Sequence, residues 1–564
     1  MSAEPRIAFL ARDLVWADES GGVLPFSYAA RKLDASLRSA PDLAGVESTV
    51  IDLRTDDPEA FFARIREFRP TLIAASTYIW STKVFCQVAK QVRAWDSSVR
   101  FVMGGPAARP SLLSLAPYAP YVDAIDAVVV GEGEEVVREL ARKHLHDDWR
   151  REVAGLVTPS PLGWRHATPQ ERPALDGYAS PYQLGNVPRD EVGFLETFRG
   201  CPMRCAFCQW GDERSDRVHS VDYLAGHLRG MADSGVERVY VLDAGFNLSP
   251  RAFRNLMEAE RQEQVLEHCQ VLGHIYPTHI RDEHLDFFDT FARAEVTVGI
   301  QSFDTAVLQA LGRRFDIPRF EAVMAQLQGR LDIDLELILG LPGDNPRSFR
   351  RTLERAMEFA TTVRVFYCLA LPDALLDRAD ELGIEFDPET FMVTRCEGWT
   401  LDELKTEWAY VLELAQSCHR PHIGPNWVDF RPNPPRRDPP VDATPKRSSN
   451  GPAARPGDRR PTELSSASRA SLGEVIDGSG TGWRLHAARV DGGALLLDLS
   501  RERRTLILEV TPARHGQRRF RELEGLAYSY RGELATGEAE RLTALILYIH
   551  AHVHATVKGL HGVF

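Results

Sequence analysis

The chain has 564 residues, which is too long for a single hydrophobic core, so its length alone predicts two or three domains. Its formal net charge of −13 argues against a protein that binds nucleic acid by neutralising phosphates, because such proteins carry a basic face. The stretch from Met1 to Leu10 lacks the features of a signal peptide, and no later apolar run reaches membrane-spanning length. We therefore expect an acidic cytoplasmic protein that has neither nucleic acid nor a membrane as a partner.

The first 150 residues alternate between short apolar runs and helical stretches. Helical periodicity predicts helices over 58–68, 82–95 and 133–145. The alternation predicts a five-stranded, doubly wound, Rossmann-like α/β domain over residues 1–150. Its buried parallel strands are expected at 6–11, 47–53, 71–77, 100–104 and 126–130.

Polar or glycine-rich turns follow three of these strands, at the edge where such sheets bind ligands. Glycine lets the backbone approach a ligand closely, and the helix that follows offers free N–H groups. No Gly-x-Gly-x-x-Gly pattern follows the first strand, which argues against a dinucleotide as the ligand. The candidate binding residues in these turns are Ser76, Thr77, Tyr78, Gly104, Gly105, Gly131, Glu132 and Gly133.

Residues 151–190 are rich in proline, glycine and polar residues, which predicts a connector between domains. Over residues 191–430 strand-like runs alternate again with helical stretches, and this pattern predicts a full or partial (β/α) barrel. The barrel strands are expected at 192–197, 238–242, 271–275, 296–300, 334–339 and 364–370.

The composition changes abruptly after residue 430. Proline, arginine, aspartate and serine dominate 431–465, and we predict a disordered linker over 431–478. The remainder, 479–564, is predicted to form a small α+β domain. Its expected strands are 482–490, 494–500 and 505–510, followed by a helix over 536–556.

Three of the eight cysteines form a C-x3-C-x2-C cluster directly after a predicted strand: Cys201, Cys205 and Cys208. Three thiolates on one tight loop can hold three corners of a cubane iron–sulfur cluster and leave the fourth iron open to a substrate. A zinc site would need a fourth ligand; Cys269 is distant in sequence, and His219 is the nearest rival. The isolated cysteines are predicted to be buried structural residues; they are Cys86, Cys269, Cys368, Cys396 and Cys418.

The cysteine loop, with aromatic Phe207 before its last cysteine, resembles the signature of radical S-adenosylmethionine (SAM) enzymes. The resemblance implies one four-iron, four-sulfur cluster whose open iron chelates the amino and carboxylate groups of SAM. In that family the cluster delivers one electron and splits SAM to give a 5′-deoxyadenosyl radical, which abstracts hydrogen from a substrate. An electron donor such as flavodoxin or ferredoxin is therefore an expected partner.

The same resemblance implies SAM contacts at successive strand ends downstream of the cysteines. A polar, glycine-containing turn after the second barrel strand stands where the family binds the SAM amino group. A side-chain amide and a hydroxyl after the fourth strand suit the ribose oxygens, and the turn Gly340–Asp344 would approach the adenine. The candidates are Asp243, Gly245 and Asn247 in the first turn and Gln301 and Ser302 in the second.

The N-terminal domain is similar to the cobalamin-binding domain of cobalamin-dependent radical SAM enzymes. The similarity lies in Gly104–Pro106 and in the run Asp126–Glu134, and the segments Tyr78–Trp80 and Leu371–Asp373 also match that branch. The resemblance covers residues 1 to about 430 and implies that cobalamin is a second cofactor.

One motif of other cobalamin enzymes is missing, the Asp-x-His-x-x-Gly sequence that supplies a histidine ligand to cobalt. The resemblance therefore implies cobalamin bound without that histidine. Ser76, Thr77 and Tyr78, with Arg69 before the third strand, are the candidates for lining the lower face of the corrin.

The function implied by these resemblances is cobalamin-dependent radical methylation of a carbon in a small molecule or peptide, in natural-product biosynthesis. Two alternatives stay open: a rearrangement or cyclisation without methyl transfer, and a non-catalytic iron–sulfur or cobalamin sensor. The reaction products discriminate between the three.

Overall fold

The computed structural model describes residues 5–12, 26–169, 172–212, 217–328, 330–359 and 362–432, and several strands further along the chain. The chain divides into two compact units; the described residues up to 432 belong to the first, and the later strands belong to the second. Most of the predicted linker over 431–478 and the predicted helix over 536–556 lie outside the described residues.

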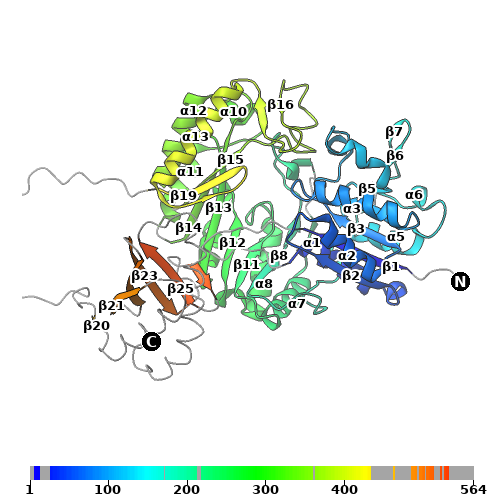
Figure 1. Cartoon of the computed structure of the whole chain (residues 1–564), viewed down its shortest axis with the longest axis horizontal. Helices are drawn as coiled ribbons and strands as arrows, with labels where there is room; N and C mark the ends of the chain where they lie inside the picture. The colour runs from blue at the N-terminus through cyan, green and yellow to red at the C-terminus, as the bar shows by residue number, and fades with distance from the viewer. Residues whose placement is uncertain are drawn as a thin grey trace, which may run out of the picture. The chain divides into compact units, whose positions relative to one another are not determined.

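The N-terminal part of the first unit is a seven-stranded sheet in the order β2-β1-β3-β4-β5-β6-β7, with helices on both faces (Figure 1). Strands β1 to β5 are parallel, and β6 and β7 add an antiparallel hairpin at one edge. The strands are β1 (Arg6–Ala11), β2 (Glu47–Asp52), β3 (Leu72–Ser76), β4 (Arg100–Gly104), β5 (Ala127–Val129), β6 (Leu156–Ser160) and β7 (Gly163–His166).

Each face of this sheet has its own apolar core. Ile7 and Phe9 of β1 pack toward α1, α5 and α6, whereas the alternating Ala8 and Leu10 pack toward α2, α3 and α4. This alternation follows from the two-residue period of a strand. The helices are α1 (Tyr28–Ser39), α2 (Pro58–Phe68), α3 (Thr82–Trp95), α4 (Pro110–Leu113), α5 (Glu134–Lys143) and α6 (Trp149–Glu152).

The five parallel strands predicted for residues 1–150 are β1 to β5, and the sequence analysis did not predict the hairpin β6–β7 or helix α1. The hairpin β6–β7 lies inside the predicted connector, where only the first residues of β6 are buried and β7 is mostly exposed, so the apolar signal is short. Helix α1 has an apolar face, but its buried residues also include the polar Lys32 and Asp34.

The second part of the first unit is an open, eight-stranded sheet in the order β18-β19-β15-β14-β13-β12-β11-β8. Its six parallel strands are the six that the sequence predicts, and an unpredicted antiparallel pair, β18 and β19, closes one edge. The predicted partial barrel is confirmed. The strands are β8 (Val192–Leu195), β11 (Arg238–Val241), β12 (Gln270–His274), β13 (Arg293–Gln301), β14 (Asp332–Leu339), β15 (Thr362–Tyr367), β18 (His419–Ile423) and β19 (Trp427–Arg431).

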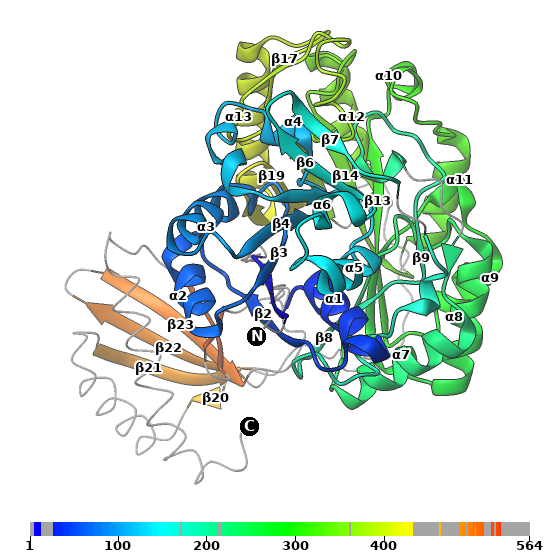
Figure 2. The same cartoon turned by 90° about the vertical axis from the view of Figure 1, so that its right-hand side faces the viewer.

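Helices cover one face of the barrel sheet (Figure 2). In β13 the buried Val296 and Val298 join the core beneath these helices, while Glu295 and Thr297 alternate with them and face the opposite side. The helices are α7 (Val221–Asp233), α8 (Pro250–Glu263), α9 (Asp282–Phe288), α10 (Thr305–Ala310), α11 (Ile317–Leu327), α12 (Pro346–Phe359) and α13 (Leu401–Ser417). Short strands complete the unit: β9 (Phe198–Arg199), β10 (Arg217–Val218), β16 (Glu385–Phe386) and β17 (Val393–Arg395).

Aromatic side chains join the two parts of the first unit. Phe26 and Tyr28, at the start of α1, belong to the core of the barrel rather than to the N-terminal sheet. The Phe26 ring meets the Phe194 ring edge to face at 5.3 Å, and Tyr28 lies 5.7 Å from the same ring. Such contacts bury apolar area from both parts and fix their relative position.

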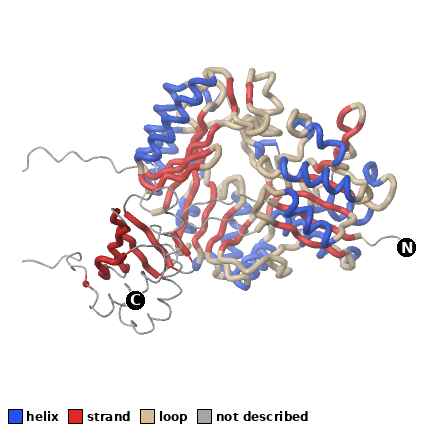
Figure 3. The backbone as a smooth tube through the Cα atoms, viewed as in Figure 1, coloured by secondary structure: helices blue, strands red, loops and turns tan. Residues whose placement is uncertain are grey.

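The second unit contains a six-stranded antiparallel sheet in the order β20-β21-β22-β23-β25-β24 (Figure 3). The three strands predicted for this region correspond to β21, β22 and β23. One short strand, β20, falls inside the stretch predicted to be linker. The bounds are β20 (Thr462–Glu463), β21 (Arg484–Asp491), β22 (Ala494–Arg501), β23 (Arg504–Pro512), β24 (Arg521–Leu523) and β25 (Leu526–Arg531).

Candidate functional site

The cysteine loop follows β9 at the end of the barrel sheet where the parallel strands finish. Cys201 and Cys205 are buried, and Cys208 is half-buried. Gly200 precedes the first cysteine with a φ of 101°, a backbone conformation that side chains other than glycine rarely adopt. The loop is also held from outside, because the Ala206 amide donates to the Leu311 carbonyl at 2.8 Å.

The three thiols share a common, poorly hydrated environment. Burial raises the pKa of Cys201, and it raises the pKa of Cys208 to about 11. A buried thiol keeps its proton at neutral pH unless a cation replaces it, and binding of iron or another metal supplies that cation. Cys201 and Cys208 must therefore release their protons when they bind iron.

No group of three His, Cys, Asp or Glu side chains in the part of the chain that the structure describes is arranged around a single metal ion. The ring of His219, the rival zinc ligand, lies between two carboxylates: its Nδ1 is 2.9 Å from Asp176 Oδ1, and its Nε2 is 3.8 Å from Glu196 Oε2. Three cysteines on one loop match the ligand set of a cubane with one open iron.

Arg313 is the residue beside the cysteines that the sequence analysis missed. Its Nη1 lies 3.6 Å from Cys205 Sγ, its Nη2 donates to the Gly299 carbonyl, and its guanidinium stands 4.8 Å from the centre of the Tyr276 ring. Arg313 is only 8% exposed, and its Nε has no partner among the described residues. A buried cation with an unused donor therefore adjoins the cysteine loop.

The turn predicted to bind the SAM amino group has its polar atoms engaged elsewhere. Asp243 accepts from the backbone N–H of Thr197 at 2.8 Å and also from its hydroxyl, and burial raises the pKa of Asp243 to about 7. Asn247 exchanges two hydrogen bonds of 2.8 Å with the backbone of Tyr276. A Cβ on Gly245 would come within 2.8 Å of Leu248. In this structure these residues position the strands around the cysteine loop.

Gln301 ends strand β13, at the same end of the barrel sheet as the cysteines, and Ser302 follows it. Gln301 has a φ of 71° at a bulge in the pairing with β14, and its buried Oε1 has no partner among the described residues. Ser302 is fully buried, and its hydroxyl lies 3.4 Å from Thr352 Oγ1 and 3.5 Å from Asp344. Gln301 thus offers a free acceptor, whereas Ser302 orders the turn behind it.

The predicted ligand edge of the N-terminal sheet is formed by the turns after β3, β4 and β5. Thr77 and Gly105 meet there so closely that a Cβ on Gly105, whose φ is 98°, would come within 2.7 Å of the Thr77 carbonyl. The Thr77 hydroxyl donates to the Ala75 carbonyl, so it supports the turn. Ser76 and Gly104 end the paired strands β3 and β4 beside them.

Aromatic and basic side chains lie at the same edge. The Tyr78 ring stacks on Trp80 at 4.7 Å. Arg12 follows β1, where the chain continues to β2 on one side of β1 and later returns to β3 on its other side, the switch point of the sheet. The buried Nε and Nη1 of Arg12 have no partner among the described residues. Ligands of open α/β sheets bind at this point. Arg69 does not lie near these residues. It precedes β3, whereas Ser76 ends that strand, so Arg69 lies at the opposite end of the strand, and it is exposed.

The turn after β5 reaches the barrel through its carboxylates. Gly131 has a φ of 107° with open space beside its Cα, and a Cβ on Gly133 would collide with Leu33 of α1. Glu132, predicted to contact cobalamin, instead pairs with Arg199 at 3.0 Å and with Arg217.

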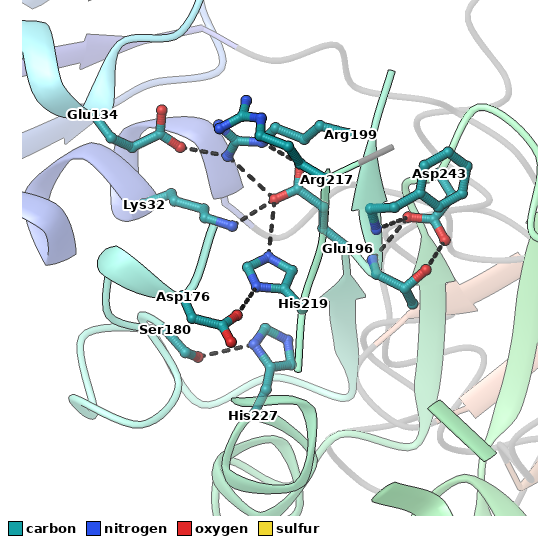
Figure 4. A network of polar contacts seen from close by, with 12 residues as sticks. Lys32, Glu134, Asp176, Ser180, Glu196, Arg199, Arg217, His219, His227 and Asp243 are labelled. Carbon is teal, nitrogen blue, oxygen red and sulfur yellow. Dashed lines mark hydrogen bonds and ion pairs between the residues drawn. The ribbon is translucent and has the colours of Figure 1, made fainter. Parts of the chain in front are cut away.

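Arg199 also pairs with Glu134 and Glu196, in a buried polar network between the two parts of the unit (Figure 4). Glu196 accepts from Lys32 of α1 and from Arg199 Nε, the latter at 2.8 Å. Burial alone would raise the pKa of Glu196, but Arg199 and Lys32 reverse this and hold the pKa well below its ordinary range. The carboxylate therefore stays ionised, and breaking one of these pairs would leave a buried charge.

His227 lies at the margin of the same network, and its neutral form is required. Its Nε2 donates to the Phe194 carbonyl at 2.9 Å, which leaves Nδ1 to accept from Ser180 Oγ at 2.9 Å. Burial lowers the pKa of His227 to about 3. The ordinary pKa of histidine is about 6.5. Between that pH and about pH 3 the unfolded chain therefore binds more protons than the folded chain, so the free energy of unfolding falls as the pH falls.

We expect His227→Gln, which can keep one donor and one acceptor, to weaken this pH dependence by about 1.4 kcal/mol per pH unit between pH 6 and pH 4. Urea unfolding at several pH values measures the change. His268→Gln is the control, because the His268 side chain is 79% exposed. Parallel pH curves for wild type and His227→Gln would show that His227 does not carry the effect.

The inner face of the barrel sheet is charged. His274 Nε2 lies 3.5 Å from Glu336 Oε2, and Arg364 lies 3.5 Å from Glu336 Oε1 and 3.1 Å from Asp429. The His274 side chain is 51% exposed, and the neighbouring Glu336 carboxylate raises its pKa. A separate cavity of about 510 Å³ opens beside Arg293 and Asp332, where β13 and β14 begin, at the opposite end of these strands from Gln301.

Each of the two parts of the first unit matches the model of a known protein family. Residues 195–356 match the Radical SAM superfamily, and residues 31–141 match the B12 binding domain. The chain therefore carries one region similar to radical SAM enzymes and one region similar to B12-binding domains. The superfamily match includes the cysteine loop, Arg313 and the end of β13, and the B12 match includes the turns after β3, β4 and β5.

Curated relatives of the chain include two methyltransferases. It is 28% identical over 346 residues to 2-(S-pantetheinyl)-carbapenam-3-carboxylate methyltransferase of Streptantibioticus cattleyicolor, covering 56% of this chain and 49% of the relative. It is 27% identical over 376 residues to the cobalamin-dependent radical SAM methyltransferase TokK of Streptomyces tokunonensis, covering 60% and 53%. The match thus spans about half the length of each of these relatives.

Solved structures share the fold at lower sequence identity. TsrM from Kitasatospora setae, solved with tryptophan and a SAM analogue, gives a TM-score of 0.52 at 19% identity, over 66% of this chain and 76% of TsrM. OxsB with aqua-cobalamin and SAM gives 0.57 at 14% identity, over 75% and 69%. No helix among the described residues has the length and apolar character needed to cross a membrane.

Proposed function

We propose that the protein is a methyltransferase that uses a four-iron, four-sulfur cluster, SAM and cobalamin to methylate a carbon of a small molecule or peptide. The observation that carries this proposal is the position of the cysteine loop, which lies between the end of the barrel strands and the ligand edge of the B12-binding domain. Both methyltransferase relatives add weight to methyl transfer over other radical reactions.

The chain's own residues fit these three groups. Cys201, Cys205 and Cys208 would hold the cluster through three thiolates, and Gln301 Oε1, which has no partner among the described residues, would accept a hydrogen bond from SAM. Arg12 pairs with Asp56 through Nη2, and its Nε and Nη1, unpartnered among the described residues, would donate to oxygen atoms of cobalamin. When bound, the cofactors supply one-electron cleavage of SAM and a carrier for its methyl group.

The charged inner face of the barrel favours a polar substrate. His274, Glu336 and Arg364 present both signs of charge on the face of the sheet that the helices leave uncovered. The relatives fit this view, because two of them act on a carbapenam carboxylate and on tryptophan, which are small polar molecules. A flavodoxin or ferredoxin would supply the electron.

The products of SAM test the proposal. Anaerobically reconstituted protein, given hydroxocobalamin, dithionite and SAM, is expected to release both S-adenosylhomocysteine, from methyl transfer, and 5′-deoxyadenosine, from radical formation. Release of 5′-deoxyadenosine alone would favour a rearrangement or cyclisation, and release of neither would favour a sensor. A denatured sample of the same preparation sets the background.

A further inference from the structure

The two ends of the cysteine loop are each fixed to a ligand turn of the B12-binding domain. At the first end stands Arg199, two residues before Cys201. Its Nη1 lies 3.0 Å from Glu132 Oε2, and its Nη2 pairs with Glu134. The Arg199 side chain is 15% exposed, and the Glu132 and Glu134 side chains are 9% and 6% exposed. These are buried pairs, whose geometry must be kept because an unmatched charge there is costly.

At the other end stands Gln209, the residue directly after Cys208. Its Nε2 donates to the Pro106 carbonyl at 3.1 Å and to the Pro372 carbonyl at 3.0 Å. Pro106 belongs to the turn after β4, and Pro372 follows the end of β15. One amide group therefore joins the cysteine loop, the B12-binding domain and the barrel.

A second contact reinforces this junction. Arg109 donates from Nη1 to the Gly105 carbonyl at 2.9 Å and pairs through Nε with Asp373 at 2.6 Å. The turn that contains Gly105 and Pro106 is consequently fixed to the barrel twice, once through Gln209 and once through Arg109. Movement of the cysteine loop and movement of this turn cannot be independent.

We propose that Arg199 and Gln209 are positioning residues that couple cluster assembly to cobalamin binding, an inference that rests on the proposed function. A cluster on the three cysteines orders the loop between Arg199 and Gln209. That order is passed to the turns after β5 and β4 through Glu132, Glu134 and the Pro106 carbonyl, so less conformational entropy is lost when cobalamin binds there. By linkage, cobalamin must stabilise the cluster by the same factor.

The test compares hydroxocobalamin affinity in two forms of the full-length chain, cluster-free and cluster-loaded, by equilibrium dialysis under argon. We expect the cluster-loaded wild type to bind roughly fivefold tighter or more, the lower end of typical coupling. Gln209→Met keeps the length of the side chain without its donors, and Glu132→Gln keeps its shape without its charge. Each is expected to bring the affinity ratio close to one.

A matched control comes from a pair that also joins the B12-binding domain to the barrel part of the unit. Lys83 and Glu389 lie 3.3 Å apart but have side chains 56% and 62% exposed, and neither contacts the cysteine loop among the contacts described. Lys83→Ala is expected to keep the wild-type ratio. Retention of iron against a chelator, with and without hydroxocobalamin, measures the reciprocal effect and should change in parallel.

A ratio of one in the wild type would overturn the inference, as would a full wild-type ratio in both Gln209→Met and Glu132→Gln. Circular dichroism checks that each variant is folded. If one of the two variants does not fold, Arg199→Lys replaces it, because lysine keeps the positive charge but not the forked geometry of arginine. Failure of the wild type to bind hydroxocobalamin in either form would instead contradict the proposed function itself.

Discussion

The Cys205→Ala protein is expected to lose the iron–sulfur chromophore and to cleave SAM no faster than background. Cys205 is 7% exposed and sits at the centre of the cysteine loop, beside Arg313, so no other side chain can take its place without rearrangement of the loop. Two remaining thiolates cannot hold three corners of a cubane. Iron content, the visible spectrum and 5′-deoxyadenosine release after anaerobic reconstitution measure the loss.

Cys418→Ser provides the control for this experiment. Cys418 is half-buried at the end of α13, and its amide caps that helix by donating to the Ala415 carbonyl. Its removal is expected to leave about four iron atoms per chain, the content of one cubane. A chromophore that survived in Cys205→Ala, or one that disappeared in Cys418→Ser, would show that the cluster is not held by the 201–208 loop.

The sequence predicts the barrel well because its signals are local. Each parallel strand is a short apolar run followed by a helix, and all six were placed within a few residues of their observed bounds. The cysteine spacing is likewise a local pattern, which is why it leads to the radical SAM family. Edge strand β18 was missed because it alternates between exposed and half-buried residues and so carries no apolar signal. Its partner β19 is buried at its centre but has only five residues, one of them the buried Asp429.

The roles of individual polar residues depend on tertiary contacts and were less predictable. Asp243 and Asn247 stand in the expected turn, but their partners come from neighbouring strands, so their engagement with backbone groups cannot be read from spacing. Arg313 reaches Cys205 across 108 residues. Glu132 occupies a glycine-rich turn typical of ligand contacts, yet its ion pairs join it to the barrel.

Arg313→Gln is expected to lower the midpoint potential of the cluster by on the order of 100 mV. A positive charge near the cysteine sulfurs favours the reduced, more negative cluster, and its N–H group acts in the same direction. A unit charge about 6 Å away at an effective dielectric constant near 20 contributes about 3 kcal/mol, and 59 mV corresponds to about 1.4 kcal/mol for one electron. Reductive titration followed by electron paramagnetic resonance measures the potential.

The neighbouring residue supplies a control with the same change of charge. Arg314 is exposed, so solvent and salt screen its charge, and Arg314→Gln is expected to leave the potential within a few tens of millivolts of wild type. Iron content must match in all three proteins, because a lost cluster would mimic a lowered potential. Equal potentials for the two variants would mean that Arg313 acts only in packing against Tyr276. A shift confined to Arg313→Gln would instead show that its charge helps to set how readily the cluster accepts the electron used to cleave SAM.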